Sequence, residues 1–563
     1  MRASAASSAV APPVSDKPRR RLSGRALSLA GLAFCIACVG LVAGRWIAAN
    51  PRIAGWDELQ YILLVVKDAF VRQAAGWGPF RDGLFNDYRW ATPGPRLLGL
   101  PLSLAGLATP GPLRAASAGL LLLCLGILFD ALRRLTSIAP AAAATALVAV
   151  SPQIATVAEN YMSEAPLMPA IAGLLWCFVR ESEDPPPRLW NAALMGACVG
   201  AGLLARFSFV PIAAGVALAL AWQFAASPDR ERQGARLLVA GLAAALIAWP
   251  FYAYDGVRYA KYTQFALTYP LDHLVASGRL DFARQWLGVL AFQVFGVLAF
   301  PAVALGVVLA IPAMAPACRR GWRSPDARVL AFAASMLIAG SVFVGIATHA
   351  NQNPRYLVGV LPVLAIPVAL GFARVRALAG AGLLLAVVQA GLMAAFVWLP
   401  PSIWPPLRGF SELSHRANVT CDFAPILDLA RQTGQPAPLV RMIGSSDAFN
   451  HVQLEMQGYR HGLPLDALPT PITPDPDAEI AAAAAADLLL ILSPDVDAAW
   501  PHPAIPNPNR DVARILGAVR QNVMLTEVKL ANVSATSQCD VLAFVPRQKL
   551  DPAARERLLR ALH

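Results

Sequence analysis

The chain has 563 residues, of which 56% are hydrophobic and 15% are charged, and its mean hydropathy is +0.51. A soluble protein would carry about a quarter charged residues, so the composition excludes a soluble globular enzyme and indicates a polytopic membrane protein. The net charge of +12 does not indicate a nucleic-acid ligand, because the basic residues lie in short segments between apolar stretches. Membrane topology accounts for that pattern.

The N-terminal segment, residues 1–25, is polar and basic, and an apolar stretch follows at 26–44. A cleaved signal peptide has a shorter apolar region and a cleavage site of small residues. This stretch is long enough to cross a bilayer. We therefore predict an uncleaved first span, with residues 1–25 in the cytoplasm.

Apolar stretches near the crossing length of about 20 residues recur through the first 400 residues and predict about eleven spans. They are 26–44, 113–132, 138–157, 162–179, 190–206, 207–225, 237–253, 286–311, 328–347, 356–373 and 377–398. In this threading every inside loop is basic, for example at Arg133 with Arg134 and at Arg374 with Arg376, as the positive-inside rule requires. An odd number of spans leaves the C-terminal part outside.

The first outer loop is predicted to run over 45–112. Its apolar stretch 95–109 is short and is interrupted by Pro101. If this stretch crossed the membrane, Arg133 and its neighbour would lie outside, against the positive-inside rule. We therefore predict that 59–75 and 95–109 are helices lying on the outer surface.

The C-terminal part, 400–563, is more polar and predicts a small extracytoplasmic α/β domain. Strand-like runs occur at 439–443, 488–492 and 541–545, and helical stretches occur at 422–433 and 510–522. Cys421 and Cys539 lie near its two ends. Outside the cytoplasm they could form a disulfide; the alternative is two unrelated thiols.

Several charged residues fall on the outer face in this threading, close to the ends of spans. They are Asp57, Glu58, Glu159, Glu164, Arg206 and Arg355. Each arginine alone could simply snorkel to the interface, but carboxylates and arginines gathered on one face suggest a site. Arginine suits a lipid-linked phosphate, and a carboxylate suits a general base or a ligand for a divalent cation.

In order, spacing and side, these motifs resemble the GT-C glycosyltransferases, specifically the branch of protein O-mannosyltransferases and aminoarabinose transferases. The matching residues are Trp56-Asp57-Glu58, Arg114 at the start of the second span, Tyr161-Met162-Ser163-Glu164, Arg206, and Arg355-Tyr356-Leu357. The resemblance implies a GT-C-like catalytic domain over 26–399.

The resemblance also implies roles for the residues on the outer face. Asp57 corresponds to the general base of the family's first loop, and Glu58 could share or replace that role. Glu164 corresponds to the acidic position of the second loop, where the family often has Asp, and Glu159 competes with it. The donor phosphate is expected to bind Arg206, Arg355 and Tyr356, and Glu159 and His349 are candidate substrate contacts.

The function implied is transfer of a sugar from a polyprenyl-phosphate donor to an acceptor hydroxyl, with inversion, at the outer face of the inner membrane. The acceptor stays open among a glycolipid, a glycan and a protein. The metal is unknown, with Mg²⁺ or Mn²⁺ as the divalent options, and no other cofactor is expected.

Three other functions stay open at this stage. One is a flippase or transporter, although such proteins usually carry ionisable or broken-helix sites near the midplane. Another is an oligosaccharyltransferase, although a WWDYG-type signature is absent from the tail. The third is a non-catalytic membrane protein that binds glycans.

Overall fold

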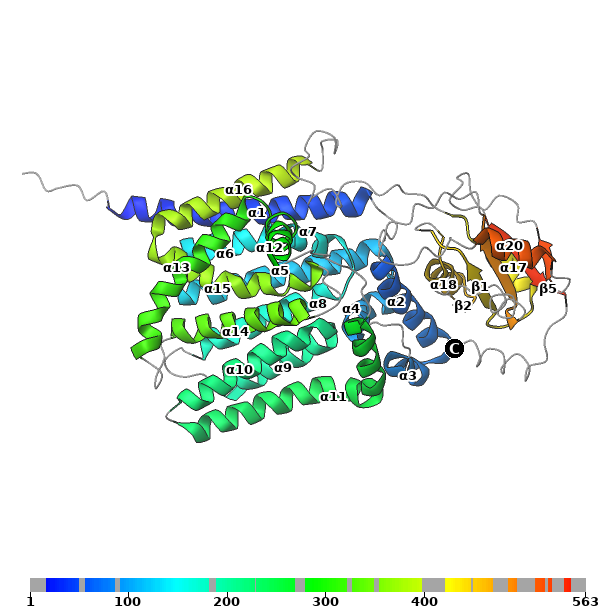
Figure 1. Cartoon of the computed structure of the whole chain (residues 1–563), viewed down its shortest axis with the longest axis horizontal. Coiled ribbons are helices and arrows are strands. Elements are labelled where there is room, and N and C mark those ends of the chain that lie inside the picture. The colour runs from blue at the N-terminus through cyan, green and yellow to red at the C-terminus, as the bar shows by residue number, and fades with distance from the viewer. Residues whose placement is uncertain are drawn as a thin grey trace, which may run out of the picture.

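The structure is a computed structural model (Figure 1). It describes residues 17–49, 56–86, 92–181, 189–227, 229–268, 279–320, 327–348, 354–396, 421–446, 449–468, 485–493, 512–521, 525–528 and 541–547. The helices of the N-terminal part are α1 (Lys17–Ala49), α2 (Trp56–Ala75), α3 (Trp77–Asn86), α4 (Pro93–Leu104), α5 (Pro110–Leu135), α6 (Ile138–Ala149), α7 (Pro152–Glu159), α8 (Glu164–Arg180), α9 (Leu189–Ala205), η1 (Phe207–Phe209), α10 (Val210–Ala226), α11 (Arg230–Thr268), α12 (Arg279–Gly288), η2 (Val289–Val294), α13 (Ala299–Arg320), α14 (Ala327–Thr348), η3 (Pro354–Leu357), α15 (Val360–Arg374) and α16 (Arg376–Phe396).

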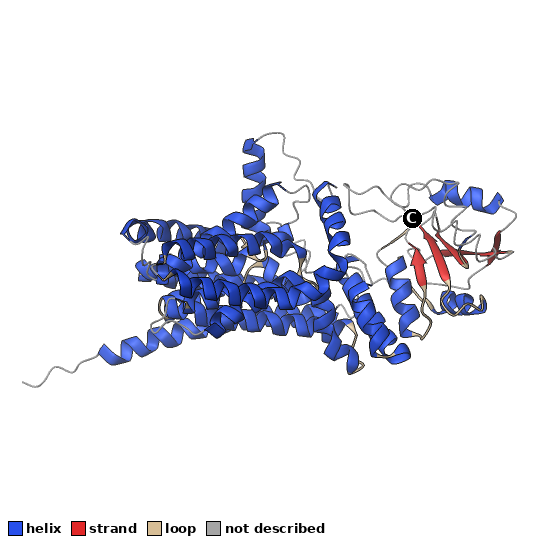
Figure 2. Cartoon of the chain, turned by 90° about the horizontal axis from the view of Figure 1, so that it is seen from below, coloured by secondary structure: helices blue, strands red, loops and turns tan. Residues whose placement is uncertain are grey.

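The long apolar helices pack side by side into one bundle (Figures 1 and 2). Helices α6, α8 and α15 form much of its centre, with almost every side chain buried. Small residues allow close approach: a Cβ at Gly196 would lie 2.0 Å from the carbonyl oxygen of Ala240 on α11. Such close packing is how helices associate where lipid removes the hydrophobic driving force.

The structure supports a multi-pass membrane protein but not the full count of eleven spans. Among the described residues, six helices are long and apolar enough to cross a membrane, or eight if each of two bent pairs is one span. Helices α9 and α15 are apolar but have only 17 and 15 residues.

Two predicted spans are broken. The stretch 138–157 bends by 63° between α6 and α7, where Ser151 precedes Pro152 and a residue before proline avoids helical geometry. The stretch 286–311 bends by 113° between η2 and α13, at Gly296 with a φ of 87°. Sequence analysis treated both stretches as continuous.

Helices α2, α3 and α4 lie at one end of the bundle, between it and the strands (Figure 1). Of these, α2 and α4 occupy the two stretches predicted to be surface helices, and α3 was not predicted. The start of α5 and the end of α7 lie at this same end. Arg114 of α5 bonds to Glu58 of α2, and the backbone N–H of Tyr161, which follows α7, donates to the same carboxylate. We call it the site end of the bundle.

The C-terminal part contains a five-stranded sheet with the order β2-β1-β3-β5-β4. Its elements are α17 (Ala424–Gln432), β1 (Leu439–Ile443), α18 (His451–Arg460), β2 (Asp466–Leu468), β3 (Leu488–Leu492), α20 (Val512–Gln521), β4 (Leu525–Val528) and β5 (Val541–Pro546). Strand β1 runs parallel to β2 and β3, and β5 runs antiparallel to β3 and β4. Residues of α17 and α18 share one apolar cluster with the sheet, and those of α20 share another.

This part of the chain contacts the bundle through α18, which packs against α2. Val452 and Met456 of α18 are buried in one cluster with Leu59 and Ile62 of α2. The ring of Tyr459 lies 5.4 Å from that of Phe70, centroid to centroid. The sheet is thereby attached to the first helix of the site end.

Cys421 is disulfide-bonded, whereas Cys35, Cys38, Cys124, Cys177 and Cys198 are free thiols. Its predicted partner, Cys539, lies outside the described residues, so the pairing stays a prediction.

We expect a non-reducing digest of the purified protein to contain the peptides of Cys421 and Cys539 joined, and reductant to separate them. Mass spectrometry after alkylation checks this; the buried free thiol Cys124 is the internal control. Alkylated Cys421 without reductant, or Cys421 joined to another cysteine, would contradict the pairing.

Candidate active site

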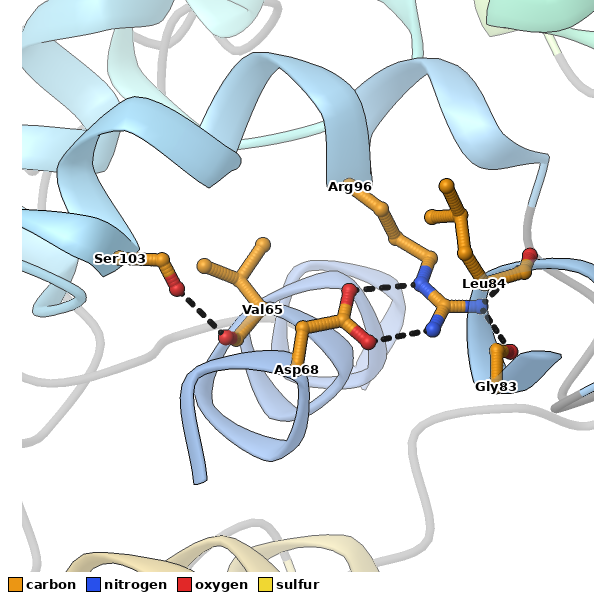
Figure 3. Close-up of polar contacts among 6 residues, drawn as sticks. All are labelled: Val65, Asp68, Gly83, Leu84, Arg96 and Ser103. Carbon is orange, nitrogen blue, oxygen red and sulfur yellow. Dashed lines mark hydrogen bonds and ion pairs between the residues drawn. The ribbon is translucent and has the colours of Figure 1, made fainter. Parts of the chain in front are cut away.

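The three helices α2, α3 and α4 are held together by a buried ion pair (Figure 3). Arg96 of α4 donates from Nε to Oδ2 of Asp68 on α2 at 2.9 Å, and its Nη2 reaches the second carboxylate oxygen. Its Nη1 donates to the carbonyl oxygens of Gly83 and Leu84 on α3. The side chains are 2% and 6% exposed. One guanidinium therefore bonds to all three helices, and the hydroxyl of Ser103 on α4 adds a second polar link by donating to the carbonyl oxygen of Val65 on α2 at 3.0 Å.

Glu58 is fixed in the same manner, against the bundle. Its two carboxylate oxygens accept from Nε and Nη2 of Arg114 on the first turn of α5, each at 2.7 Å. The backbone N–H of Tyr161 donates to Oε1 at 2.9 Å. The guanidinium also lies 4.6 Å from the ring centroid of Trp46 on α1. Both Glu58 and Arg114 are fully withdrawn from solvent, at 1% and 0% exposure.

These contacts favour a positioning role for Glu58. A carboxylate whose two oxygens already accept guanidinium hydrogen bonds is poorly suited to accept a proton from a substrate. Its neighbour Asp57 occupies the first turn of α2, although the side chain of Asp57 is outside the described part. The Glu58–Arg114 pair thus fixes the backbone that carries the predicted base.

The turn between α7 and α8 is tied to the same group. The hydroxyl of Tyr161 donates to the carbonyl oxygen of Pro95 on α4. Burial raises the pKa of Tyr161, so the phenol keeps the proton with which it donates. A Cβ at Gly99 would meet this same hydroxyl at 2.7 Å, so only glycine lets α4 lie so close.

Glu164, Arg206, Arg355 and Tyr356 come together from three separate elements. Nη1 of Arg206, at the junction of α9 and η1, forms an ion pair with Oε1 of Glu164 on the first turn of α8. Nε of Arg355, on η3, lies 3.8 Å from the same oxygen. The guanidinium of Arg206 is 4.9 Å from the ring centroid of Tyr356, a cation–π distance.

This cluster has an excess of positive charge that can meet an anion. Among the described side chains it holds two guanidinium groups and one carboxylate, which leaves one net positive charge. The side chain of Glu164 is 3% exposed and that of Arg206 10%, but that of Arg355 is 29% exposed. Arg355 is therefore the member that solvent, or a ligand arriving at the site end, can reach. The structure thus brings these four predicted residues close together.

Glu159, the last residue of α7, is separate from this cluster and 1% exposed. Its Oε1 has no hydrogen-bond partner among the described residues, and Arg114 supplies the positive charge that acts on it. It therefore lies within the electrostatic influence of Arg114. His349 lies outside the described residues, and its predicted role stays a prediction.

A metal site is not formed by the part of the chain that the structure describes. No three His, Cys, Asp or Glu side chains there gather closely enough to hold an ion. Glu58 and Glu164 each pair with arginine, which makes them poor ligands for a cation. The described residues thus do not fit a dedicated metal site, and we derive no step through a metal.

Sequence analysis missed the ion pair of Asp68 with Arg96 and the pairing role of Arg114. Arg96 lies within the apolar stretch 95–109, and a charged residue that is buried there needs a partner of opposite charge. The sequence therefore indicated that such a partner exists. Sequence alone does not say which partner, since the two members are separated by 28 residues in one pair and 56 in the other.

Comparison with known proteins gives both a family model and solved structures. The model described as dolichyl-phosphate-mannose-protein mannosyltransferase matches residues 97–254. ArnT from Cupriavidus metallidurans in the apo state matches with a TM-score of 0.54 at 16% identity, over 93% of this chain and 98% of that chain. The same protein bound to undecaprenyl phosphate matches with a TM-score of 0.55 at 14% identity, over 92% and 98%. No curated protein sequence matches the chain.

The platform of α2, α3 and α4 should depend on its buried ion pair. Arg96→Met leaves the Asp68 carboxylate buried without its partner, and we expect it to lower the free energy of unfolding by ~3–5 kcal/mol. The double variant Arg96→Met/Asp68→Leu should lose less than Arg96→Met alone. Unfolding of the purified protein in detergent, followed by intrinsic fluorescence, measures both.

The matched control is the exposed pair of Arg81 and Asp82 on α3, whose side chains are 72% and 59% exposed. Arg81→Met should change stability by less than ~1 kcal/mol. Equal effects of Arg96→Met and Arg81→Met would show that the buried pair does not hold the platform.

Proposed function

Given the GT-C fold that the motifs predicted and the comparisons confirm, we propose that the chain is a glycosyltransferase that uses a polyprenyl-phosphate-linked sugar. The reaction would take place at the outer face of the inner membrane, with the C-terminal part extracytoplasmic. The observation that carries the proposal is the cluster of Arg206 and Arg355 around Glu164 at the site end. Its excess positive charge suits a phosphate on a lipid, and a structural neighbour of this fold has been solved with undecaprenyl phosphate bound.

The proposed reaction transfers a proton to Asp57 and develops negative charge on the leaving phosphate. Asp57 takes the proton from an acceptor hydroxyl, whose oxygen attacks the anomeric carbon of the donor sugar. The bond from that carbon to the phosphate oxygen breaks, and the phosphate leaves with the electron pair. A phosphodiester carries about one negative charge and a monoester between about 1.5 and 2. Negative charge therefore grows on the phosphate during the reaction.

The two arginines meet this growing charge. An arginine has five N–H donors, and the ion pair with Glu164 uses one nitrogen of Arg206. The rest of the fork can bind phosphate oxygens. Because the interaction strengthens as the phosphate gains charge, it lowers the barrier more than it lowers the ground state. Displacement by a single base without a covalent intermediate inverts the anomeric centre.

In this mechanism Glu164 positions Arg206 and Arg355 and does not act as a base. It compensates the repulsion between two neighbouring guanidinium groups, which otherwise destabilises a site before the donor arrives. The guanidinium of Arg206 also lies over the ring of Tyr356, which restricts the rotation of the arginine side chain.

Asp57→Asn should abolish transfer. The amide cannot accept the hydroxyl proton, yet it has nearly the same shape, so the helix should be kept. The assay follows labelled polyprenyl-phosphate sugars, one at a time, into product in inner-membrane vesicles that contain the natural acceptors. Asp82→Asn on α3 is the control with the same chemical change and should keep full activity. Undiminished turnover by Asp57→Asn would refute the assignment of the base.

Loss of one phosphate arginine should slow the reaction while leaving the fold intact. We expect Arg355→Gln to raise the barrier by at least ~2 kcal/mol, which is more than tenfold in rate. Arg355→Lys, which keeps the charge but not the fork, should recover part of the loss. Initial rates at saturating donor measure this. If Arg355→Gln turned over at the wild-type rate, the donor phosphate would not lie at this cluster.

If the protein were a flippase, the same vesicle assay would give a different result. The donor would cross the bilayer without being consumed, and Asp57→Asn would leave that movement unchanged. No consumption of any donor by the wild type would favour that function over the proposed transferase.

A further inference from the structure

The break between α6 and α7 and the break between η2 and α13 are joined by a hydrogen bond. Ser151, in the break between α6 and α7, donates from its hydroxyl to the carbonyl oxygen of Val294, the last residue of η2. The other break starts directly after Val294 and ends where α13 begins. Backbone groups freed by a broken helix need partners inside a membrane bundle, because no bulk water is present to satisfy them.

One side chain supplies most of these partners. Gln389 of α16, 2% exposed, donates from Nε2 to the carbonyl oxygens of Val150 at 2.7 Å and Phe295 at 2.9 Å. Its Oε1 accepts from the backbone N–H groups of Leu298 at 3.2 Å and Ala299 at 3.0 Å. A glutamine amide offers two donors and two acceptor sites. All four are used, and they reach both breaks at once.

The local backbone is built around this amide. Gly296 has a φ of 87°, and a Cβ there would lie 2.2 Å from Nε2 of Gln389. Any other residue at this position would be strained in the backbone and would also collide with the amide. The glycine and the glutamine therefore form one unit.

This unit is linked to the predicted donor-phosphate residues through η2. Segment η2, whose end it holds, contacts both η3 and α7. Segment η3 carries Arg355 and Tyr356, and α7 ends in Glu159.

We propose that Gln389 is a positioning residue for Arg355, acting through η2. This inference rests on the proposed function only for the identity of the ligand. By bonding to both breaks the amide fixes η2, and η2 is the surface against which η3 packs. Without those bonds η2 is free to shift, and Arg355 loses its place beside Glu164.

The test is a double-mutant cycle on binding of a polyprenyl phosphate, without sugar, to the protein purified in detergent. Gln389→Met has nearly the same length but makes none of the four hydrogen bonds. We expect it to weaken binding by about tenfold, as Arg355→Met does, and the double variant should be no weaker than Arg355→Met within about threefold. Coupled residues give such non-additive losses, whereas independent ones add.

Gln233→Met, with the same chemical change at the opposite end of the bundle on α11, is the control and should bind as the wild type does. A second variant, Gln389→Glu, keeps the acceptor half of the amide and serves if Gln389→Met does not fold. Additive losses, or wild-type binding by both Gln389 variants, would overturn the inference.

Hydrogen exchange separates this inference from the proposed function. In the Gln389 variants the amides of 289–299 and 354–358 should exchange at least about tenfold faster, and those of α18 should not change. If the wild type binds no polyprenyl phosphate, the donor assignment is wrong, and the exchange result alone decides the positioning role. Unchanged exchange over 354–358 in a folded Gln389 variant would refute it.

Discussion

The site end of the bundle depends on the pairing of Glu58 with Arg114. Both side chains are withdrawn from solvent, and an unpaired charge in such a place costs several kcal/mol. The bidentate contact removes that cost only if the first turns of α2 and α5 keep one relative position. Tyr161 and Trp46 fix the pair from two further segments. Four parts of the chain therefore depend on the guanidinium of Arg114, and Asp57 is the sequence neighbour of Glu58, which it binds.

Helix α2 is held along its whole length by contacts of different kinds. Near its start Glu58 binds α5, and further along Asp68 binds Arg96 of α4. Between these polar contacts, its apolar residues pack against Val452 and Met456 of α18. The C-terminal part thus covers the helix that carries the predicted base. A rigid support of this kind keeps a catalytic group within the narrow geometry that a displacement reaction needs.

Hydropathy and loop charges were enough to predict the helical bundle and helices over most of α2 and α4. The residues that meet around Glu164 were predicted from charges on one face together with the family resemblance. Hydropathy and loop charges were not enough to predict the breaks in 138–157 and 286–311, because a window of apolar residues looks the same whether or not the helix continues. Ser151-Pro152 was a local hint. At Gly296 the cause is a contact with Gln389, 93 residues away, which no local pattern reveals. For the same reason the partner of Glu58 could not be predicted.

The contacts also separate the roles of carboxylates that look equivalent in sequence. Glu58 binds Arg114 through both of its oxygens. Oε1 of Glu164 binds Arg206, and its Oε2 accepts from the hydroxyl of Ser163. Accepting a substrate proton would break such bonds. Glu159 has an oxygen without a partner among the described residues, but it is buried at the end of α7 behind Arg114. A general base must lie within hydrogen-bond reach of the proton that it takes. Of the four acidic residues predicted for the site, Asp57 therefore stays the proposed base, and the pairing of Glu58 with Arg114 fixes its place at the first turn of α2.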